Sequence, residues 1–187
     1  MLAAARCDEA FYTRDAVTVA RALIGCALVH GPRAGVIVET EAYLGPEDLA
    51  SHARFGVTAR NSVMYGRGGF AYVYLCYGIH EMFNIVTGPE GAGQAVLVRA
   101  VAPLVGFGAP PAGDAVGRGP GKVTRALAID RRHDRRDLLA GDLFVAAHAD
   151  APRIAVGPRV GVDYAGRWAR RRLRFWWHGH AAVSRTR

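Results

Sequence analysis

The sequence predicts an α+β protein built on a mostly antiparallel, curved β-sheet. Strand-forming runs occur in pairs separated by turn residues, which is the pattern of β-hairpins. Few segments show helical periodicity, so the helices are expected to be short. No internal repeat and no linker divides the 187 residues, a length that fits one domain. We therefore predict a single domain over residues 1–187, with short helices around the sheet and one protruding hairpin.

The first elements are predicted to be a helix and a hairpin. Residues 14–24 carry an apolar stripe, with Thr13 as a candidate N-cap and Gly25 as a stop signal. Residues 26–29 and 36–43 are strand-forming runs on either side of a turn rich in Gly and Pro. The second of these runs is expected to return beside the first.

The second predicted hairpin joins residues 70–77 to residues 79–87. Gly78 interrupts the two β-prone runs, so Tyr77 and Gly78 are expected near the tip of the hairpin. The other expected elements are, in order, a short helix at 47–54, a polar loop at 55–67, a strand at 94–101, a long Gly- and Pro-rich loop at 103–121, a helix at 122–129, strands at 143–147, 154–156 and 173–177, and a basic helix at 167–172.

Composition places the chain among globular proteins. Hydrophobic residues make up 51% of it and charged residues 21%, which favours a packed core over disorder. No apolar run reaches about 18 residues, so no membrane span is predicted. Asp8 and Glu9 stand where a secretion signal needs an apolar core, and we therefore expect a cytoplasmic protein. The three cysteines lie far apart, so neither a metal site nor a disulfide framework is expected.

The charge balance favours a nucleic-acid partner. The formal net charge is +8, and a basic surplus is the electrostatic footprint of proteins that bind phosphate backbones. Lys122 is the only lysine, so all the other basic residues counted here are arginines. They gather at residues 131–132, 135–136 and 167–174.

Residues 35–52, GVIVETEAYLGPEDLASH, contain the candidate active centre. An apolar run leads directly into Glu39, Glu41 and Tyr43, which share one face of a strand because side chains alternate with period two. A carboxylate is costly to bury without a purpose, although an isolated one is more often a solvated edge residue. A base held at the end of a core strand suits general-base chemistry. Periodicity alone does not choose between Glu39 and Glu41.

Aromatic residues offer a possible nucleobase pocket. Core packing is the simple interpretation of Tyr72 and Tyr74, which share a strand face. The functional interpretation is a set of flat platforms, Tyr43, His52 and Tyr74, for a base taken out of a duplex. Tyr77, at a hairpin tip, is then the candidate wedge that fills the vacancy.

Two polar residues lie inside β-prone runs. Asn84 and Arg99 have structural hydrogen bonding as their default role. In a base pocket, Asn84 could read an edge of the base, and Arg99 could hold Glu41 or a phosphate.

These residues, taken in order, resemble the alkyladenine DNA glycosylase family, the mammalian type of 3-methyladenine DNA glycosylase. The resemblance covers nearly the whole chain, and it is most specific in the first and third of the following blocks: ETEAYLGPED to His52 (39–52), Arg60-Asn61 with Met64, YVYLCYG (72–78), Asn84, GPGKVTRALAI (119–129), and RVGVDYAGRWAR (159–170) to Phe175. His80 stands where the mammalian members have a tyrosine.

The resemblance implies a role for each of these positions. Glu41 is similar to the general base that activates a water to attack the sugar. Tyr43, His52 and Tyr74 are similar to the stacking walls of the base pocket. Tyr77 resembles the wedge that fills the gap in the duplex. The other implied roles are Asn84 as the residue that disfavours normal guanine, Leu97 and Val162 as apolar lining, and Arg60, Arg99 and Lys122 as contacts to the DNA backbone.

The expected function is therefore a monofunctional base-excision repair glycosylase without metal or cofactor. The family's substrates include 3-methyladenine, 7-methylguanine, hypoxanthine and ethenoadenine. The expected partner is double-stranded DNA with damaged purines, and we expect a monomer with no obligate protein partner. Two other classes fit parts of the pattern. A lesion-binding or architectural DNA protein needs Tyr77 and the arginines but not Glu41, and a nucleosidase needs the pocket but not the wedge.

Overall fold

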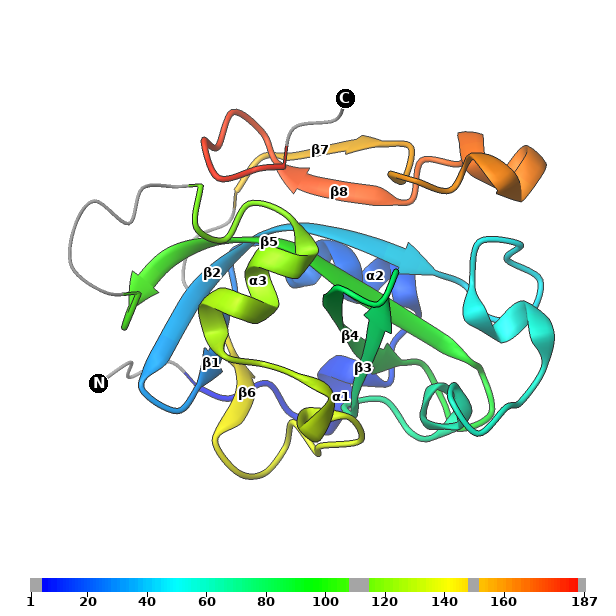
Figure 1. The fold of residues 1–187 in the computed structure, drawn as a ribbon, viewed down its shortest axis with the longest axis horizontal. Coiled ribbons are helices and arrows are strands. Elements are labelled where there is room, and N and C mark those ends of the chain that lie inside the picture. Colours follow the sequence, from blue (N-terminus) through cyan, green and yellow to red (C-terminus); the bar gives the residue numbers. More distant parts are fainter. Residues whose placement is uncertain (1–4, 108–114, 148–151, 185–187) are drawn as a thin grey trace.

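The structure is a computed structural model that describes residues 5–107, 115–147 and 152–184. These residues form one eight-stranded sheet (Figure 1). Its order is β3-β4-β5-β2-β1-β6, while β8 pairs with β2 and β7 pairs with β8. Every pairing is antiparallel, so the predicted fold class is confirmed. The strands are β1 (Ala27–His30), β2 (Arg33–Tyr43), β3 (Ala71–Cys76), β4 (His80–Thr87), β5 (Gln94–Val105), β6 (Leu143–Ala146), β7 (Ile154–Gly157) and β8 (Arg174–Trp177).

Strand β2 is the centre of the sheet because it changes partner along its length. Its first half pairs with β1, and its second half pairs with β8, from Glu39 opposite Trp176 to Glu41 opposite Arg174. Strand β5 lies along the other side of β2. Glu39 and Glu41 thus sit where β2 has a neighbour on each side, which explains why both are fully buried.

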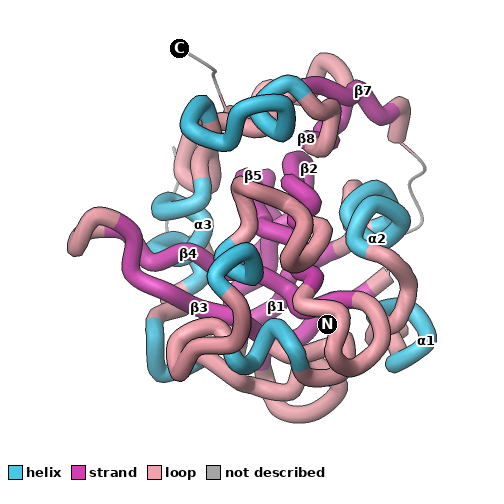
Figure 2. Tube along the Cα trace, turned by 90° about the vertical axis from the view of Figure 1, so that its right-hand side faces the viewer, coloured by secondary structure: helices cyan, strands magenta, loops and turns pink. Residues whose placement is uncertain are grey.

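Two helices cover opposite sides of the sheet (Figure 2). Helix α2 (Ala16–Ala22) packs on β2 and β5, and Thr40 donates a hydrogen bond of 2.8 Å to the Ala20 carbonyl. Helix α3 (Pro120–Leu127) packs on β4 and β5. No helix in the described part of the chain is long and apolar enough to cross a bilayer.

The β3–β4 hairpin extends away from the body of the molecule (Figure 2). Its tip is a tight turn in which the Ile79 N–H donates to the Cys76 carbonyl. The predicted hairpin, with Tyr77 and Gly78 at the tip, is therefore confirmed. Thr124 of α3 supports this hairpin close to its tip, through a 3.0 Å hydrogen bond to the Glu81 carbonyl.

The predicted first helix begins two residues later than expected. Asp15 is the N-cap of α2, since its carboxylate accepts hydrogen bonds from the Val17 and Thr18 N–H groups. Thr13, the predicted cap, instead ends the short helix α1 (Glu9–Tyr12), which sequence periodicity did not reveal. With Asp15 as N-cap, two N–H groups of the first helical turn have a hydrogen-bond acceptor. Thr13 is two residues further away and cannot reach these groups.

The helix predicted over residues 47–54 is wrong in its first half. Residues 46–51 form turns, and only a 3₁₀ helix, η1 (His52–Phe55), follows. The Asp48 carboxylate accepts hydrogen bonds from the Leu44 and Ala50 N–H groups, so it stabilises a turn in place of a helix.

The other boundaries shift in smaller ways. Strand β5 runs on to Val105, so the predicted loop at 103–121 starts later, and its residues 108–114 lie outside the described residues. Helix α3 starts at Pro120, which favours a first helical turn. The basic helix predicted at 167–172 is right only for residues 167–170, which end η4 (Asp163–Arg170); residues 171 and 172 lie outside it. Two further 3₁₀ helices were not predicted, η2 (Ser62–Tyr65) and η3 (Arg131–His133).

Candidate active site

One row of directly opposed residues crosses five strands and forms the floor of the site. Tyr72 lies opposite Asn84, Asn84 opposite Leu97, Leu97 opposite Glu41, and Glu41 opposite Arg174. Opposed residues of neighbouring strands present their side chains on the same face of a sheet. The antiparallel register therefore brings Glu41, Leu97 and Asn84, which are far apart in sequence, next to one another.

Glu41 is a buried carboxylate with three polar neighbours. Its Oε1 accepts a 2.7 Å hydrogen bond from the Val160 N–H, and its Oε2 accepts one of 2.9 Å from the Tyr43 hydroxyl. The Arg99 Nη1 lies 3.4 Å from Oε1. Burial raises the pKa of Glu41, whereas the Arg99 charge, the Val160 N–H and the Tyr43 hydroxyl oppose that rise. A carboxylate with raised proton affinity, held rigidly, is equipped to take a proton from water.

Glu39 has a different set of partners, although it shares the strand face. Its Oε1 accepts hydrogen bonds from the Arg99 Nε at 3.1 Å, the Arg174 Nε at 2.6 Å and the Ser184 hydroxyl at 2.8 Å. Its Oε2 accepts one of 2.7 Å from the Ser184 N–H. Two guanidinium groups and a hydroxyl thus surround the Glu39 carboxylate, which leaves it little capacity for further donors.

The predicted aromatic walls lie together. The rings of His52 and Tyr74 are 4.6 Å apart between centroids, and those of Tyr72 and Tyr74 are 5.2 Å apart. His52 Nδ1 lies 2.8 Å from the Tyr72 hydroxyl, which fixes the imidazole plane. Tyr43 donates to Glu41, and both are near Tyr74, since, besides burial, Tyr74 contributes to raising the pKa of the Tyr43 hydroxyl and the Glu41 charge contributes to raising that of Tyr74. The ring faces and the carboxylate therefore belong to one region.

Burial keeps His52 neutral near physiological pH. It lowers the pKa of His52 to about 4, and the Arg60 and Arg54 charges add to the effect. A neutral imidazole can stack on a cationic aromatic ring without repulsion, which a protonated one cannot.

We expect the folded protein to show this shift directly. The His52 imidazole should titrate near pH 4 in an NMR titration, and the His52→Gln variant identifies its signal. Because the folded-state pKa lies below the ordinary value of about 6.5, the unfolded chain binds a proton between pH 6.5 and 4 that the folded protein does not. The free energy of unfolding should therefore decrease as the pH is lowered from 6.5 to 4, and the decrease should be smaller in His52→Gln. A midpoint above pH 6 would contradict the expected shift.

The predicted polar and apolar lining residues differ in their positions. Asn84 is buried and donates a 3.1 Å hydrogen bond to the Tyr72 carbonyl, so its amide plane is held against β3. Leu97 is buried between Asn84 and Glu41. Val162 is buried in the main hydrophobic core, and the backbone of Val160, two residues earlier, contacts Glu41.

The three predicted backbone contacts also differ. Arg99 is 8% exposed and is engaged by Glu39 and Glu41, so the phosphate role predicted for it stays a prediction. Lys122 is exposed on α3, with its Nζ 3.4 Å from the Ala115 carbonyl. Arg60 lies with its guanidinium carbon 5.0 Å from the Tyr74 ring centroid and donates to the Leu75 carbonyl.

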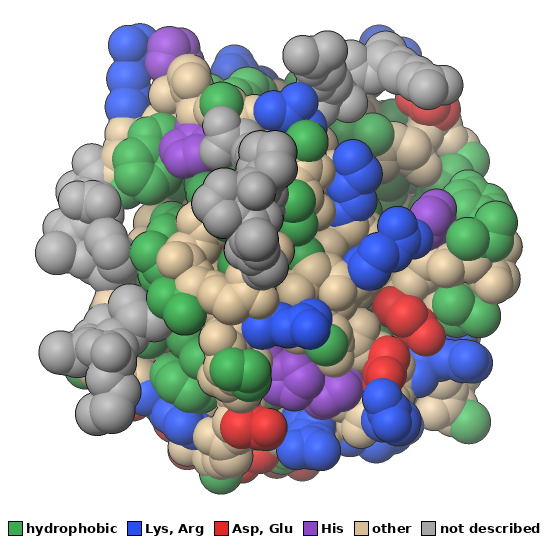
Figure 3. All heavy atoms as spheres, turned by 60° about the vertical axis from the view of Figure 1, so that its left-hand side comes forward, with side chains coloured by type: hydrophobic (Ala, Val, Ile, Leu, Met, Phe, Trp, Pro, Cys, Tyr) green, Lys and Arg blue, Asp and Glu red, His purple; other side chains and the backbone are tan. Residues whose placement is uncertain are grey.

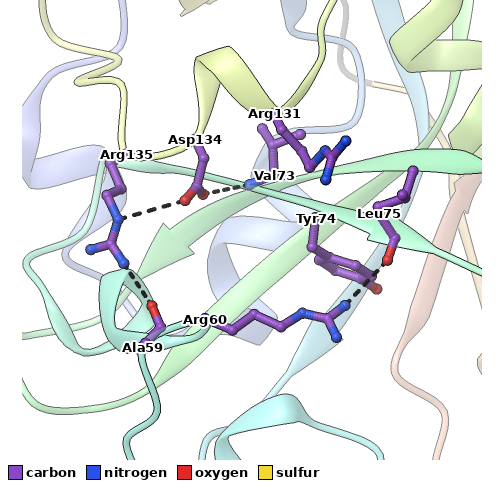
Figure 4. Close-up of a pocket in the computed structure, with 8 residues that line it drawn as sticks. All are labelled: Ala59, Arg60, Val73, Tyr74, Leu75, Arg131, Asp134 and Arg135. Atoms are coloured by element: carbon purple, nitrogen blue, oxygen red, sulfur yellow. Dashed lines mark hydrogen bonds and ion pairs between the residues drawn. The ribbon is translucent and has the colours of Figure 1, made fainter. Parts of the chain in front are cut away.

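Arg60 also borders a basic cavity along the free edge of β3 (Figure 4). The cavity has a volume of about 510 Å³. Asp134 closes one side by accepting a hydrogen bond from the Val73 N–H, and Arg135 donates to the Ala59 carbonyl. Its lining residues are Ala59, Arg60, Val73, Tyr74, Leu75, Arg131, Asp134 and Arg135. Asp134 pairs with Arg135 and Glu81 with Arg131, so the three arginines leave a surplus of one positive charge at this edge.

The pair of Asp48 and Arg159 was not identified from the sequence. Both side chains are fully buried, with Arg159 Nη1 2.5 Å and Nη2 2.8 Å from the Asp48 carboxylate. Arg159 also donates to the Ala42 carbonyl, and its guanidinium carbon lies 4.7 Å from the Tyr43 ring centroid. The pair thus ties the turn after β2 to the segment that carries the Val160 N–H. Nothing in the spacing of two residues 111 positions apart signals such a contact.

No group of three or more His, Cys, Asp or Glu side chains that could hold a metal ion is found among the described residues.

The sequence matches a known protein family over most of its length. Residues 10–181 match the model of the family described as Methylpurine-DNA glycosylase (MPG). The chain belongs to the methylpurine-DNA glycosylase family. It is therefore a DNA glycosylase, an enzyme of DNA repair whose substrate is DNA, and the predicted family and enzyme class are confirmed.

Bacterial relatives of this DNA glycosylase carry the provisional name 3-methyladenine DNA glycosylase. One from Anaeromyxobacter dehalogenans (strain 2CP-C) is 54% identical over 184 residues, covering 95% of this chain and 86% of the relative. One from Myxococcus xanthus (strain DK1622) is 49% identical over 183 residues, covering 95% and 92%. One from Legionella pneumophila (strain Paris) is 43% identical over 183 residues, covering 94% and 96%.

Proposed function

We propose that this methylpurine-DNA glycosylase flips damaged purines out of duplex DNA and hydrolyses the N-glycosidic bond with a water activated by Glu41. The substrates are alkylated or deaminated purines of the classes 3-methyladenine, 7-methylguanine, hypoxanthine and ethenoadenine. The observation that carries the proposal is the position of Glu41, which is buried opposite Leu97, with Asn84 on the far side of Leu97, and which accepts a hydrogen bond from Tyr43.

Glu41 is suited to activate water. Its raised pKa makes it a stronger base than an exposed glutamate, while the Val160 N–H and Tyr43 hydroxyl fix its orientation. As positive charge develops on the sugar, the nearby carboxylate also stabilises it. As the C1′–N bond breaks, a C1′–O bond forms to water, one proton of the water passes to Glu41, and the purine leaves with the electron pair of the broken bond. An alkylated, cationic purine leaves as a neutral base, whereas hypoxanthine leaves as an anion that takes up a proton.

The walls of the pocket select the base. Tyr43, His52 and Tyr74 offer aromatic faces on which a flipped purine stacks. Alkylated purines carry positive charge, which an electron-rich ring face attracts. Asn84 stands on the pocket floor with its amide held by the Tyr72 carbonyl, where it opposes the exocyclic amine of normal guanine.

Tyr77 is the wedge, and its backbone supports that role. It has a φ of 50° at the hairpin tip and its side chain is 91% exposed. A non-glycine residue in the left-handed region costs roughly 1–3 kcal/mol, and an exposed ring gains nothing from packing to offset that cost. Ile79 beside it is 72% exposed and extends the apolar tip. An apolar, strained tip is explained by insertion between base pairs.

Tyr77→Asn should separate stability from function. Asparagine tolerates the left-handed conformation better than tyrosine, so the melting temperature should stay the same or rise. Excision of hypoxanthine from duplex DNA should fall at least about tenfold, because the wedge no longer offsets the cost of flipping. Excision from single-stranded DNA should change little. An equal loss on both DNA forms, or a fall in melting temperature, would contradict the wedge.

Arginine side chains supply the affinity for the DNA backbone. Basic side chains are spread over the face shown in Figure 3, with acidic ones between some of them. Arg60 and the cationic edge of β3 lie beside the hairpin, and Lys122 lies on the helix that supports it. Phosphates that flank the flipped nucleotide are their proposed partners. Lys122 is the only lysine, and we assign it to the backbone, so no Schiff-base lyase step follows excision.

One assay tests the proposed function against its alternatives. Release of free base is measured on a hypoxanthine-containing duplex and on the free nucleoside inosine, with and without borohydride. A monofunctional glycosylase releases base from the duplex and forms no trapped adduct. Binding without release indicates an architectural protein, equal release from the nucleoside indicates a nucleosidase, and a trapped adduct refutes the absence of a lyase step.

A further inference from the structure

A cluster of buried charged residues lies beside Glu41, and base catalysis by Glu41 does not by itself require all of them. Glu39, Arg99, Arg174 and Ser184 form one hydrogen-bonded cluster. Arg174 is 6% exposed and lies opposite Glu41 across the β2–β8 ladder, but its Nε donates to Glu39. Two carboxylates and two guanidinium groups, counting Glu41, thus offset one another inside the protein. The other groups that act on Glu41 are the Tyr43 hydroxyl, the Val160 N–H and Arg159, whose charge is paired with Asp48.

Arg99 connects the two carboxylates. Its Nε lies 3.1 Å from the Glu39 Oε1, and its Nη1 lies 3.4 Å from the Glu41 Oε1. A guanidinium group is planar and rigid, so the bond of Nε to Glu39 determines where Nη1 points. Glu39 therefore controls how strongly Arg99 acts on Glu41.

Arg174 affects how strongly the positive charge of Arg99 acts on Glu41. Without Arg174, Glu39 would have Arg99 as its one cationic partner among these contacts, and the two carboxylates would compete for it. With Arg174 at 2.6 Å and Ser184 closing the other side, Glu39 is neutralised from behind. The charge of Arg99 then remains available to favour the ionised form of Glu41, which burial disfavours.

We propose that Glu39 and Arg174 are positioning residues that act through Arg99 to set the pH at which Glu41 becomes an active base. The proposal rests on the proposed role of Glu41. It assigns a function to the second carboxylate of the ETE motif and to an arginine of the C-terminal strand, neither of which contacts the substrate.

Two substitutions should shift the pH profile in opposite directions. Glu39→Gln removes a like charge near Glu41 and frees Arg99 for it, so the pKa of Glu41 falls. Arg174→Gln removes a positive charge and draws Arg99 towards Glu39, so the pKa of Glu41 rises. In single-turnover excision of hypoxanthine from duplex DNA, the acidic limb should move to lower pH in the first variant and to higher pH in the second. Each shift should be on the order of one pH unit.

A merely structural role does not give shifts of opposite sign, because both substitutions damage the same buried cluster. The double variant Glu39→Gln/Arg174→Gln restores charge balance and should return the acidic limb towards wild type, even if one single variant fails to fold. Arg172→Gln is the matched control, since this exposed arginine donates to the Val156 carbonyl and not to either carboxylate of the cluster, as far as the described residues go, and it should leave the limb in place.

The outcomes separate this inference from the proposed function. If Glu41→Gln keeps near wild-type excision, the role of Glu41 is refuted and the inference falls with it. If Glu41→Gln is inactive but the single variants move the acidic limb in the same direction, or not at all, the positioning role alone is refuted. Opposite shifts with recovery in the double variant support it.

Discussion

Glu41→Gln should lower the single-turnover rate of hypoxanthine excision by about 10²–10⁴-fold. The substitution keeps the size of the side chain and an oxygen that can accept from Val160 or Tyr43, but it removes the group that takes the proton from water. Hypoxanthine is neutral and leaves poorly, so its excision depends most on the activated water. A smaller loss is expected for 7-methylguanine, whose positive charge makes it a better leaving group.

Binding should survive this substitution. The affinity for a hypoxanthine duplex, measured by fluorescence anisotropy, should stay within a few-fold of wild type, since the walls and the wedge are intact. Glu47→Gln is the matched control because Glu47 is exposed in the same stretch of chain, and it should excise at the wild-type rate. Excision by Glu41→Gln at near wild-type rate with binding retained would show that Glu41 is not the base.

The fold was predictable where the pattern is local. Alternating apolar residues and turn residues marked both hairpins, and the Tyr77–Gly78 tip followed from a glycine between two β-prone runs. The order of the strands was not predictable, because pairing of β2 with β8 depends on a register between residues more than 130 positions apart. The turn at residues 46–51 was missed because Asp48 combines local hydrogen bonds from the Leu44 and Ala50 N–H groups with an ion pair to Arg159, 111 positions away.

The candidate site shows the same limit. Periodicity placed Glu39, Glu41 and Tyr43 on one face of the strand. The contacts of Arg99 with both carboxylates agree with that placement. It could not rank the carboxylates, since their difference lies in Arg174, Ser184 and Val160, which come from other parts of the chain. The family resemblance supplied the ranking, and the contacts supply a physical reason for it.

Arg159→Met should destabilise the folded protein by about 3–5 kcal/mol, the usual cost of breaking a buried ion pair by removing one partner. Arg159 and Asp48 are both fully buried, so the carboxylate left behind keeps, among the described residues, the Leu44 and Ala50 N–H groups as its hydrogen-bond donors. Urea unfolding followed by circular dichroism measures the loss. Arg172→Met, an exposed arginine of the same C-terminal region, should change stability by less than about 0.5 kcal/mol.

The double variant Asp48→Asn/Arg159→Met decides whether charge or packing causes the loss. If the cost comes from an unpaired buried carboxylate, the neutral asparagine should recover part of the stability lost in Arg159→Met. Excision should not recover with it, because Arg159 also holds the Ala42 carbonyl and packs on the Tyr43 ring. A double variant no more stable than Arg159→Met would mean that the guanidinium matters mainly as a packed, hydrogen-bonded group between Tyr43 and the turn.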